Sequence, residues 1–212
     1  MAGSIRSTLG AFFGAVTLLV ASSSVAQTVS VPSAGGIASV EIDDSAPRAG
    51  TTVSSPNTKL SAFSLSLVAS TSKLTVRPQV YAVAGGVVGG SPIWTGPTVD
   101  VTPGAYASYT FSPDLTVNSG ETYALVVEKT VAGEEGSLEW VVPDEYAGGV
   151  PIFYSTTTTS WIDNSFFDAV FSVTFVSAAA PVPTMSEWAM IILGTMMAGG
   201  AALYIQRRRL SF

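Results

Sequence analysis

The sequence predicts an all-β protein, a β-sandwich or jelly roll, with an apolar segment at each end of the chain. Three observations lead to this fold class. Between its ends the 212-residue chain is rich in Ser, Thr, Val, Gly and Pro and poor in charge, which is typical of strands and turns. Short runs alternate apolar and polar side chains with a period of two, and none has the pattern of an amphipathic helix. The richest apolar runs lie at the two ends.

The composition excludes several classes of site. The chain has no cysteine and no histidine, which rules out disulfides, thiolate catalysis, Cys-ligated metals and Ser–His arrangements. The middle domain must therefore be held together by burial of its core, and a domain of about 150 residues buries roughly 68–70% of its unfolded surface. Residues 27–180 carry fourteen acidic and five basic side chains, an excess of nine negative charges. A field of this sign repels nucleic acid.

Residues 1–26 are typical of a secretory signal peptide. Arg6 is the only charge, Leu9 to Ala21 is apolar but short for a membrane span, and Ser24-Val25-Ala26 offers small residues to signal peptidase. We expect cleavage before Gln27. An uncleaved amino-terminal anchor is the alternative.

The expected β-sandwich ectodomain covers residues 27–176 and contains about nine or ten short strands. The alternation slips at Ala62-Phe63, which indicates a bulge, and Pro78 indicates an edge strand or a bulge. Gly and Asn clusters mark turns at 85–86, 89–90, 118–120 and 148–149. The clearest strands are expected at residues 60–68, 73–83, 107–113, 121–129, 136–142 and 168–176.

Residues 188–205 form the expected transmembrane helix. They carry no charge, and 18 residues at about 1.5 Å each span some 27 Å, close to a hydrocarbon core of roughly 30 Å. Trp188 and Tyr204 suit the two membrane interfaces, and Arg207, Arg208 and Arg209 provide a stop-transfer cluster that favours the cytoplasmic side. The precursor would then lie in the inner membrane, with its ectodomain outside the cytoplasm.

The segment just before this helix resembles a known sorting signal. The stretch Pro183-Thr184-Met185-Ser186-Glu187-Trp188, followed by the apolar span and an Arg cluster, resembles the IPTL-CTERM family of carboxy-terminal signals. That family begins Ile-Pro-Thr-Leu-Ser-Glu-Trp. Here Val182 replaces the Ile and Met185 replaces the Leu, and both substitutions keep apolar character.

The resemblance implies processing and export to the surface. Residues 182–212 would be recognised by an exosortase, a membrane enzyme with a cysteine nucleophile. It would cut near the motif and leave the protein at the cell surface or secreted. Pro183 disfavours helix at Val182, so we expect an extended motif, with Ser186-Glu187 capping the helix. Residues 177–183 are expected to be a Pro/Ala linker.

Catalytic motifs in the ectodomain are weak. Ser70 to Lys73 matches Ser-x-x-Lys, but its partner motifs are absent and the context is not helical. Four acids could act in glycoside hydrolysis, and pairs of aspartates could lend oxygens to calcium, but solvated strand and loop side chains are the favoured explanation for all of them. These acids are Glu128, Glu139, Asp144 and Glu145, and the calcium candidates are Asp43-Asp44 and Asp163 with Asp168.

Aromatic residues suggest one binding function. Flat rings can stack on pyranose sugars, whereas packing in the core is the alternative role for large aromatics in a small sandwich. Trp161, between "STTTT" and "IDN", is the best candidate for an exposed sugar contact in a loop. The other candidates are Trp94, Trp140, Tyr81, Tyr106 and Tyr146.

The second half of the domain also loosely resembles carbohydrate-binding-module-like sandwiches of bacterial surface proteins, through "NSGETYALVVE", "YAGGVPIFYS" and "DAVFSVTF". Three hypotheses remain open. The first is a non-enzymatic surface protein for adhesion or matrix scaffolding, processed by an exosortase. The second is a module that binds a surface polysaccharide, and the third is a permanently anchored single-pass protein. None of them needs a cofactor or a metal.

Overall fold

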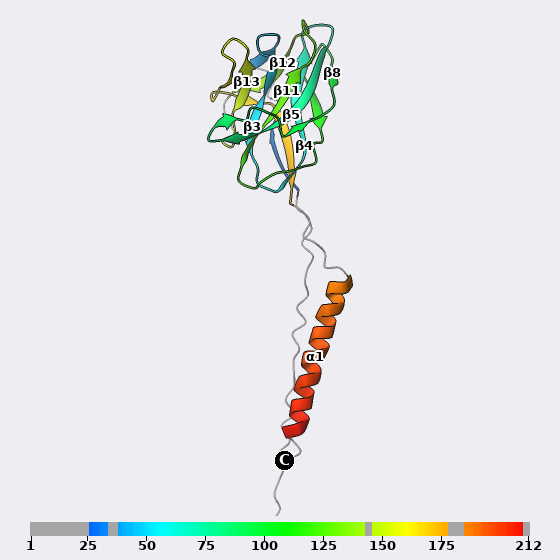
Figure 1. Cartoon of the computed structure of the whole chain (residues 1–212). Helices are drawn as coiled ribbons and strands as arrows, with labels where there is room; N and C mark the ends of the chain where they lie inside the picture. Colours follow the sequence, from blue (N-terminus) through cyan, green and yellow to red (C-terminus); the bar gives the residue numbers. More distant parts are fainter. Residues whose placement is uncertain (1–25, 34–37, 143–145, 178–184, 210–212) are drawn as a thin grey trace, which may run out of the picture. The chain divides into compact units, whose positions relative to one another are not determined.

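The computed structural model describes residues 26–33, 38–142, 146–177 and 185–209 (Figure 1). They form a β-domain and a C-terminal helix, which are separate units. Almost all of the predicted signal peptide lies outside the described residues, as do Val182, Pro183 and Thr184 of the sorting motif and most of the linker. The first strand of the β-domain starts at Ala26, next to the predicted cleavage site.

The β-domain consists of two antiparallel sheets. In the first, the order is β1 (Ala26–Val31), β16 (Phe171–Val176), β4 (Lys59–Ala69), β12 (Gly136–Val141) and β15 (Asp168–Ala169); β2 (Ala38–Ile42) pairs with β12, and β9 (Ala107–Phe111) and β10 (Leu115–Thr116) pair with β4. In the second, the order is β14 (Ser160–Asp163), β13 (Pro151–Ser155), β3 (Arg48–Ser54), β11 (Thr122–Lys129), β5 (Leu74–Ala84) and β6 (Val87–Val88); β7 (Trp94–Thr95) and β8 (Val99–Val101) pair with β5.

The core lies between the inner faces of the two sheets. On β4, Phe63, Leu65 and Leu67 point inward and are fully buried, while Ser64 and Ser66 take the other face. The second sheet contributes Val76, Val80, Leu125 and Val127 from β5 and β11 to the same cluster. Because a strand sends successive side chains to opposite faces, the two-residue period in the sequence places one apolar side of each sheet in this core. The predicted all-β sandwich is confirmed.

The break in alternation on β4 marks a real bulge. Thr174 of β16 pairs with Ala62 and Phe175 pairs with Leu60, so Ser61 is the extra residue. One additional residue on one strand returns the apolar side chains that follow it to the core face. The expected bulge therefore lies within two residues of Ala62-Phe63.

Of the two alternatives expected for Pro78, an edge strand or a bulge, the edge strand is wrong. Strand β5 pairs with β11 along its length, and its other side is covered by β6, β7 and β8. Pro78 falls in the interval between the residues that pair with β7 and those that pair with β8. The missing amide hydrogen is thus accommodated by interrupting the neighbouring strand rather than by leaving β5 at an edge.

The described β-domain contains more strands than the nine or ten expected. Sixteen are present in its described residues. Five of the additional ones, β6, β7, β8, β10 and β15, have only two or three residues. A period of two cannot be recognised in so short a run, so only pairing with a long neighbour defines these strands.

The C-terminal unit is one helix, α1 (Met185–Arg209) (Figure 1). Its segment Ala189–Arg209 is long and apolar enough to cross a membrane. Helix α1 extends beyond the predicted transmembrane helix 188–205 at both ends. Ser186 and Glu187 lie in its first turn instead of preceding it, and the three arginines form its last turn. The Thr195 hydroxyl donates to the Ile192 carbonyl at 2.8 Å, which satisfies this hydroxyl within the helix.

Candidate functional site

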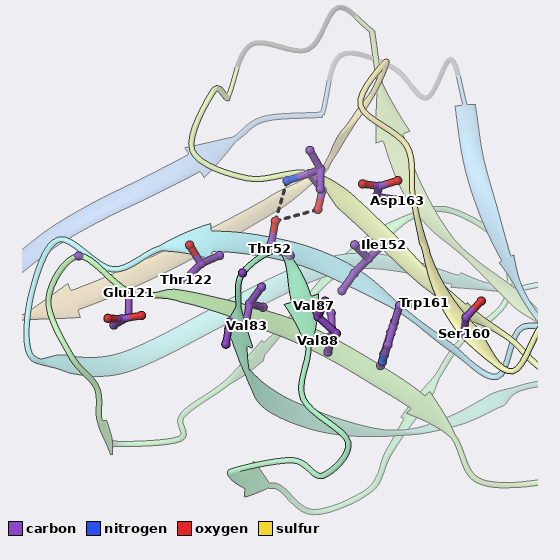
Figure 2. Close-up of a pocket in the computed structure, with 15 residues that line it drawn as sticks. Thr52, Val83, Val87, Val88, Glu121, Thr122, Ile152, Ser160, Trp161 and Asp163 are labelled. Atoms are coloured by element: carbon purple, nitrogen blue, oxygen red, sulfur yellow. Dashed lines mark hydrogen bonds between the residues drawn. The ribbon is translucent and has the colours of Figure 1, made fainter.

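A groove of about 780 Å³ lies on the outer face of the second sheet (Figure 2). Its floor and sides come from β3, β5, β6, β11, β13 and β14, together with the segments that join them. In the view of Figure 2, Glu121 and Trp161 lie on opposite sides of Val83 and Val88. The lining residues are Thr52, Val83, Ala84, Gly85, Gly86, Val87, Val88, Gly120, Glu121, Thr122, Val150, Ile152, Ser160, Trp161 and Asp163.

Trp161 contributes an aromatic ring to this groove. It lies in strand β14, not in the loop expected from the sequence, and it is half-buried. Pairing with Tyr154 places it on the outer face of the sheet. The four threonines Thr156–Thr159 are the connection of a β-hairpin, which the sequence could have indicated. They turn the chain so that Ser160 pairs back to Ser155.

Two tyrosines hold the Trp161 ring in place. Its centroid is 5.5 Å from that of Tyr81 and 5.5 Å from that of Tyr154, with interplanar angles of 70° and 73°. Edge-to-face pairs of this kind contribute about 0.5–1.5 kcal/mol beyond the area that they bury. Trp161 also packs against a small apolar cluster on this face that includes Val88, Val126 and Ile152. The ring is therefore part of an ordered surface.

A polar network connects the two tyrosines. Arg48 lies 5.1 Å from the centre of the Tyr154 ring and donates from Nε to Oε1 of Glu128 at 2.9 Å. Gln79 donates to Oε2 of Glu128 at 2.8 Å, and the Tyr81 hydroxyl donates to Gln79 at 2.6 Å. Contacts thus run in a closed circuit from Trp161 through Tyr154, Arg48, Glu128, Gln79 and Tyr81 back to Trp161.

Glu128 is ionised at the centre of this network. Burial raises the pKa of its carboxyl, but hydrogen bonds from Arg77 and Arg48, with their positive charges, outweigh this effect, and the pKa lies below its ordinary value. Burial also raises the pKa of the Tyr81 phenol, which keeps that hydroxyl a donor at neutral pH. With both oxygens engaged, Glu128 is a structural carboxylate. It does not have the free oxygen that a general acid or base needs.

Two features shape the walls of the groove. On one side, Gly85 and Gly86 have φ angles of 59° and 79°, which favour glycine, and they make the tight turn that pairs Val87 and Val88 alongside β5. On the other side, the Thr52 hydroxyl accepts from the Val150 amide at 2.8 Å and donates to the Val150 carbonyl at 3.3 Å (Figure 2). One wall is thus fixed by the conformation of two glycines and the other by a side-chain hydroxyl bound to the backbone.

The charge around the groove is negative. Glu121 and Asp163 line it and are exposed, and none of the described lining residues is basic. The hydroxyls of Thr52, Thr122 and Ser160 add donors and acceptors. The groove therefore offers one aromatic ring, a valine wall and oxygen acceptors, and it has no cation among these residues to attract an anion.

The other aromatic candidates are occupied in packing. Tyr81 and Trp140 are buried, Trp94 packs edge-on to Phe63, and Tyr146 packs against Phe171. Tyr106 is half-buried beside a smaller serine-lined hollow on the first sheet. Core packing, the alternative role for these rings, thus applies to most of them.

The two candidate acids that the structure describes, Glu128 and Glu139, do not form a catalytic pair. Glu139 is 2% exposed and accepts from the hydroxyls of Ser33 and Ser66 at 2.5 and 2.6 Å. It lies on the first sheet, whereas Glu128 lies on the second. Asp144 and Glu145 lie outside the described residues.

The calcium and Ser-x-x-Lys candidates also have structural partners. Asp43 caps the turn at Ser45 and Ala46, and Asp44 pairs with Lys129. Asp168 is buried and accepts from the Tyr146 amide at 2.8 Å. No group of three or more His, Cys, Asp or Glu that could hold a metal occurs among the described residues. Ser70 to Lys73 is a turn between β4 and β5, where Lys73 pairs with Asp100.

The C-terminal segment matches a known family. Residues 180–209 match the model described as the IPTL-CTERM motif, which confirms the resemblance drawn from Pro183 to Trp188. The match covers only this end of the chain. No curated protein sequence matches the chain significantly.

The β-domain is similar in fold to two solved structures. One is a clostridial cysteine protease, Cwp84, after propeptide cleavage, with a TM-score of 0.53 and 14% identity over 72% of this chain and 40% of its own. The other holds the cysteine protease and lectin-like domains of Cwp84, a surface layer associated protein of Clostridium difficile, with a TM-score of 0.53 and 11% identity over 72% of this chain and 36% of its own. The chain spans less than half the length of either, and at this identity the likeness concerns the fold.

Proposed function

We propose that this protein is an exported, non-enzymatic cell-surface protein whose C-terminal segment is processed by an exosortase-type enzyme. The observation that carries the proposal is the match of residues 180–209 to the IPTL-CTERM motif. It is supported by helix α1, in which an apolar stretch ends in Arg207, Arg208 and Arg209. A signal peptide at residues 1–26 starts this export.

Each part of the C-terminal segment has one task in this scheme. The helix holds the precursor in the inner membrane, and the arginines stay on the cytoplasmic side because guanidinium groups cross lipid only at high cost. The enzyme's cysteine attacks a backbone carbonyl near the motif and forms a thioester as the peptide C–N bond breaks, and the new amino end leaves with the C-terminal fragment. A nucleophile of an acceptor at the surface then takes the acyl group and releases the cysteine. The Arg-bearing fragment then remains behind in the membrane.

The β-domain is the displayed part, and we propose adhesion or matrix scaffolding as its role. A second candidate is binding of a surface polysaccharide, which the groove around Trp161 favours. The fold similarity to a structure that contains a lectin-like domain supports the same candidate. A permanently anchored single-pass protein remains the alternative to processing.

Mass spectrometry of the mature carboxyl end tests the proposal. We expect protein isolated from a strain with a working exosortase to lack Arg207–Arg209, and protein from a strain without the enzyme to retain them. Pro183→Ala should reduce processing, whereas Pro181→Ala, a matched change just before the motif, should not. Recovery of envelope protein that still carries Arg209 in the competent strain would establish permanent anchoring instead.

A further inference from the structure

The groove on the second sheet has two kinds of surface. Val83, Val87 and Val88 form an apolar side together with the Trp161 ring, whereas Glu121 and Asp163 are exposed carboxylates. A pyranose has the same division, because its axial C–H bonds form an apolar face and its equatorial hydroxyls point outward as donors. Aromatic rings pair with the C–H face and carboxylates accept from the hydroxyls.

The position of the Trp161 ring is fixed before a ligand binds. Its contacts with Tyr81 and Tyr154 are edge-to-face, and the network through Glu128 fixes both tyrosines. Figure 2 shows the ring edge-on, with Val87 and Val88 beside it. A ring whose position is set before binding loses little conformational entropy when a ligand arrives.

The charge of the groove selects against one large class of glycans. The ectodomain, residues 27–180, has fourteen acidic and five basic residues. All five basic side chains of the ectodomain form ion pairs with acids that do not line the groove. Arg48 and Arg77 pair with Glu128, Lys59 with Asp114, Lys73 with Asp100, and Lys129 with Asp44. A uronic acid in the groove would therefore meet like charges and lose its hydration without gaining an ion pair.

We propose that this groove binds an uncharged sugar residue of a polysaccharide, with the Trp161 ring on its C–H face and Glu121 and Asp163 accepting from its hydroxyls. Glycans built from uronic acids are excluded. The proposal rests on the second candidate function, carbohydrate binding, and names its site and ligand class.

Titration calorimetry on the unprocessed chain without its signal peptide, residues 27–212, in phosphatidylcholine nanodiscs tests the proposal. Nanodiscs are preferable to alkyl-glycoside detergents because those detergents present a sugar headgroup. The probes are cellopentaose, mannopentaose and maltopentaose, with galacturonic and mannuronic acid oligomers of the same length. We expect at least one neutral oligosaccharide to bind and both uronic acid oligomers to fail.

Variants then locate the site. Trp161→Ala should weaken binding of the neutral ligand by about tenfold or more, whereas Phe166→Ala should not, because Phe166 is 79% exposed and does not line the groove. The double variant Glu121→Gln and Asp163→Asn tests the acceptors without removing the ring. It should weaken the binding of the neutral oligosaccharide and reduce the difference in affinity between neutral and uronic acid oligomers.

Each negative result has a separate meaning. If none of the neutral oligosaccharides binds, carbohydrate binding itself and this site are both overturned, while sorting is untouched. If a neutral ligand binds equally to wild type, to Trp161→Ala and to the double variant, carbohydrate binding stands and this groove is the wrong site. Equal affinity for uronic acid oligomers would overturn the charge selection.

Discussion

The rings of Trp161 and Tyr81 lie with their centroids 5.5 Å apart, although their strands are not neighbours. The sheet order β14-β13-β3-β11-β5 puts four strand-to-strand steps between them. In a flat sheet four steps amount to about 19 Å. The two long side chains therefore reach toward each other across the intervening strands, and curvature of the second sheet shortens the remaining gap. This curvature makes a groove out of a surface that would otherwise be open.

A double-mutant cycle measures the contact between these two rings. Trp161→Leu and Tyr81→Leu should each destabilise the fold, and their effects should be non-additive by about 0.5–1.5 kcal/mol. Urea unfolding followed by circular dichroism gives the free energies. Additive effects would mean that the two rings do not interact in solution. The pair Trp161→Leu and Trp94→Leu serves as control, because Trp94 packs on Phe63.

The pH dependence of stability should report Glu128. Its pKa in the folded protein lies below the ordinary value of 4.5, so its stabilising contribution is fully present above that value and is lost as the pH falls through the lowered pKa. At neutral pH, Glu128→Gln should cost about 1–3 kcal/mol, because Arg48 and Arg77 lose their charged partner. We expect the difference from wild type to shrink at acid pH.

Urea unfolding of both proteins at several pH values between neutral and strongly acidic measures this change. Asp43 and Asp100, whose pKa values are also lowered, are present in both proteins and cancel in the comparison. If the difference in free energy of unfolding between wild type and Glu128→Gln does not change with pH, Glu128 does not have a lowered pKa in the folded protein.

The Lys129–Asp44 pair should respond unequally to removal of its two partners. The Lys129 side chain is only 3% exposed, whereas that of Asp44 is 68% exposed. Asp44→Asn leaves a buried ammonium without its carboxylate and should lower the urea midpoint. Lys129→Met replaces the ammonium by an apolar side chain of similar length and should be less harmful, or even stabilising. The opposite order of midpoints would show that the ammonium is not buried.

Thr159 should be a position where glycine stabilises the protein. Its φ angle is 53° in the turn that leads to Trp161, and a β-branched residue adopts this left-handed conformation only under strain. Thr159→Gly should raise the free energy of unfolding by about 1 kcal/mol. Thr158→Gly, its neighbour with an ordinary φ, should lower it slightly. A loss of stability at Thr159 comparable to that at Thr158 would argue against the left-handed turn.

Gly50 should tolerate no side chain. A Cβ at this position would meet the backbone carbonyl of Leu125 on β11, and backbone cannot move aside as a flexible side chain does. Gly50→Ala should therefore cost about 1–3 kcal/mol. Gly90→Ala is the matched control, because nothing lies within 4 Å of its added methyl group. Similar melting temperatures for the two variants would contradict the close approach of β3 and β11.

The sequence alone identified those features whose cause is local. The alternation of Ala169, Phe171, Val173 and Phe175 with Ser172 and Thr174 predicts a half-buried strand, because neighbouring residues on a strand face opposite sides. The apolar stretch before Arg207 predicts a helix that can span a membrane, because length and composition decide this. The Pro183–Trp188 pattern identified the sorting motif through its resemblance to the IPTL-CTERM family, which depends on these neighbouring residues alone.

Only the tertiary structure decided which residues meet across the sheets. Nothing near Trp161 in the sequence indicates Tyr81 or Val88, since the curvature of the second sheet depends on the packing of the whole core. The burial of Lys129 likewise depends on residues far away in the chain, because its partner Asp44 belongs to a different part of the sandwich. Secondary structure follows from local periodicity, whereas a groove is made by the arrangement of strands that are distant in sequence.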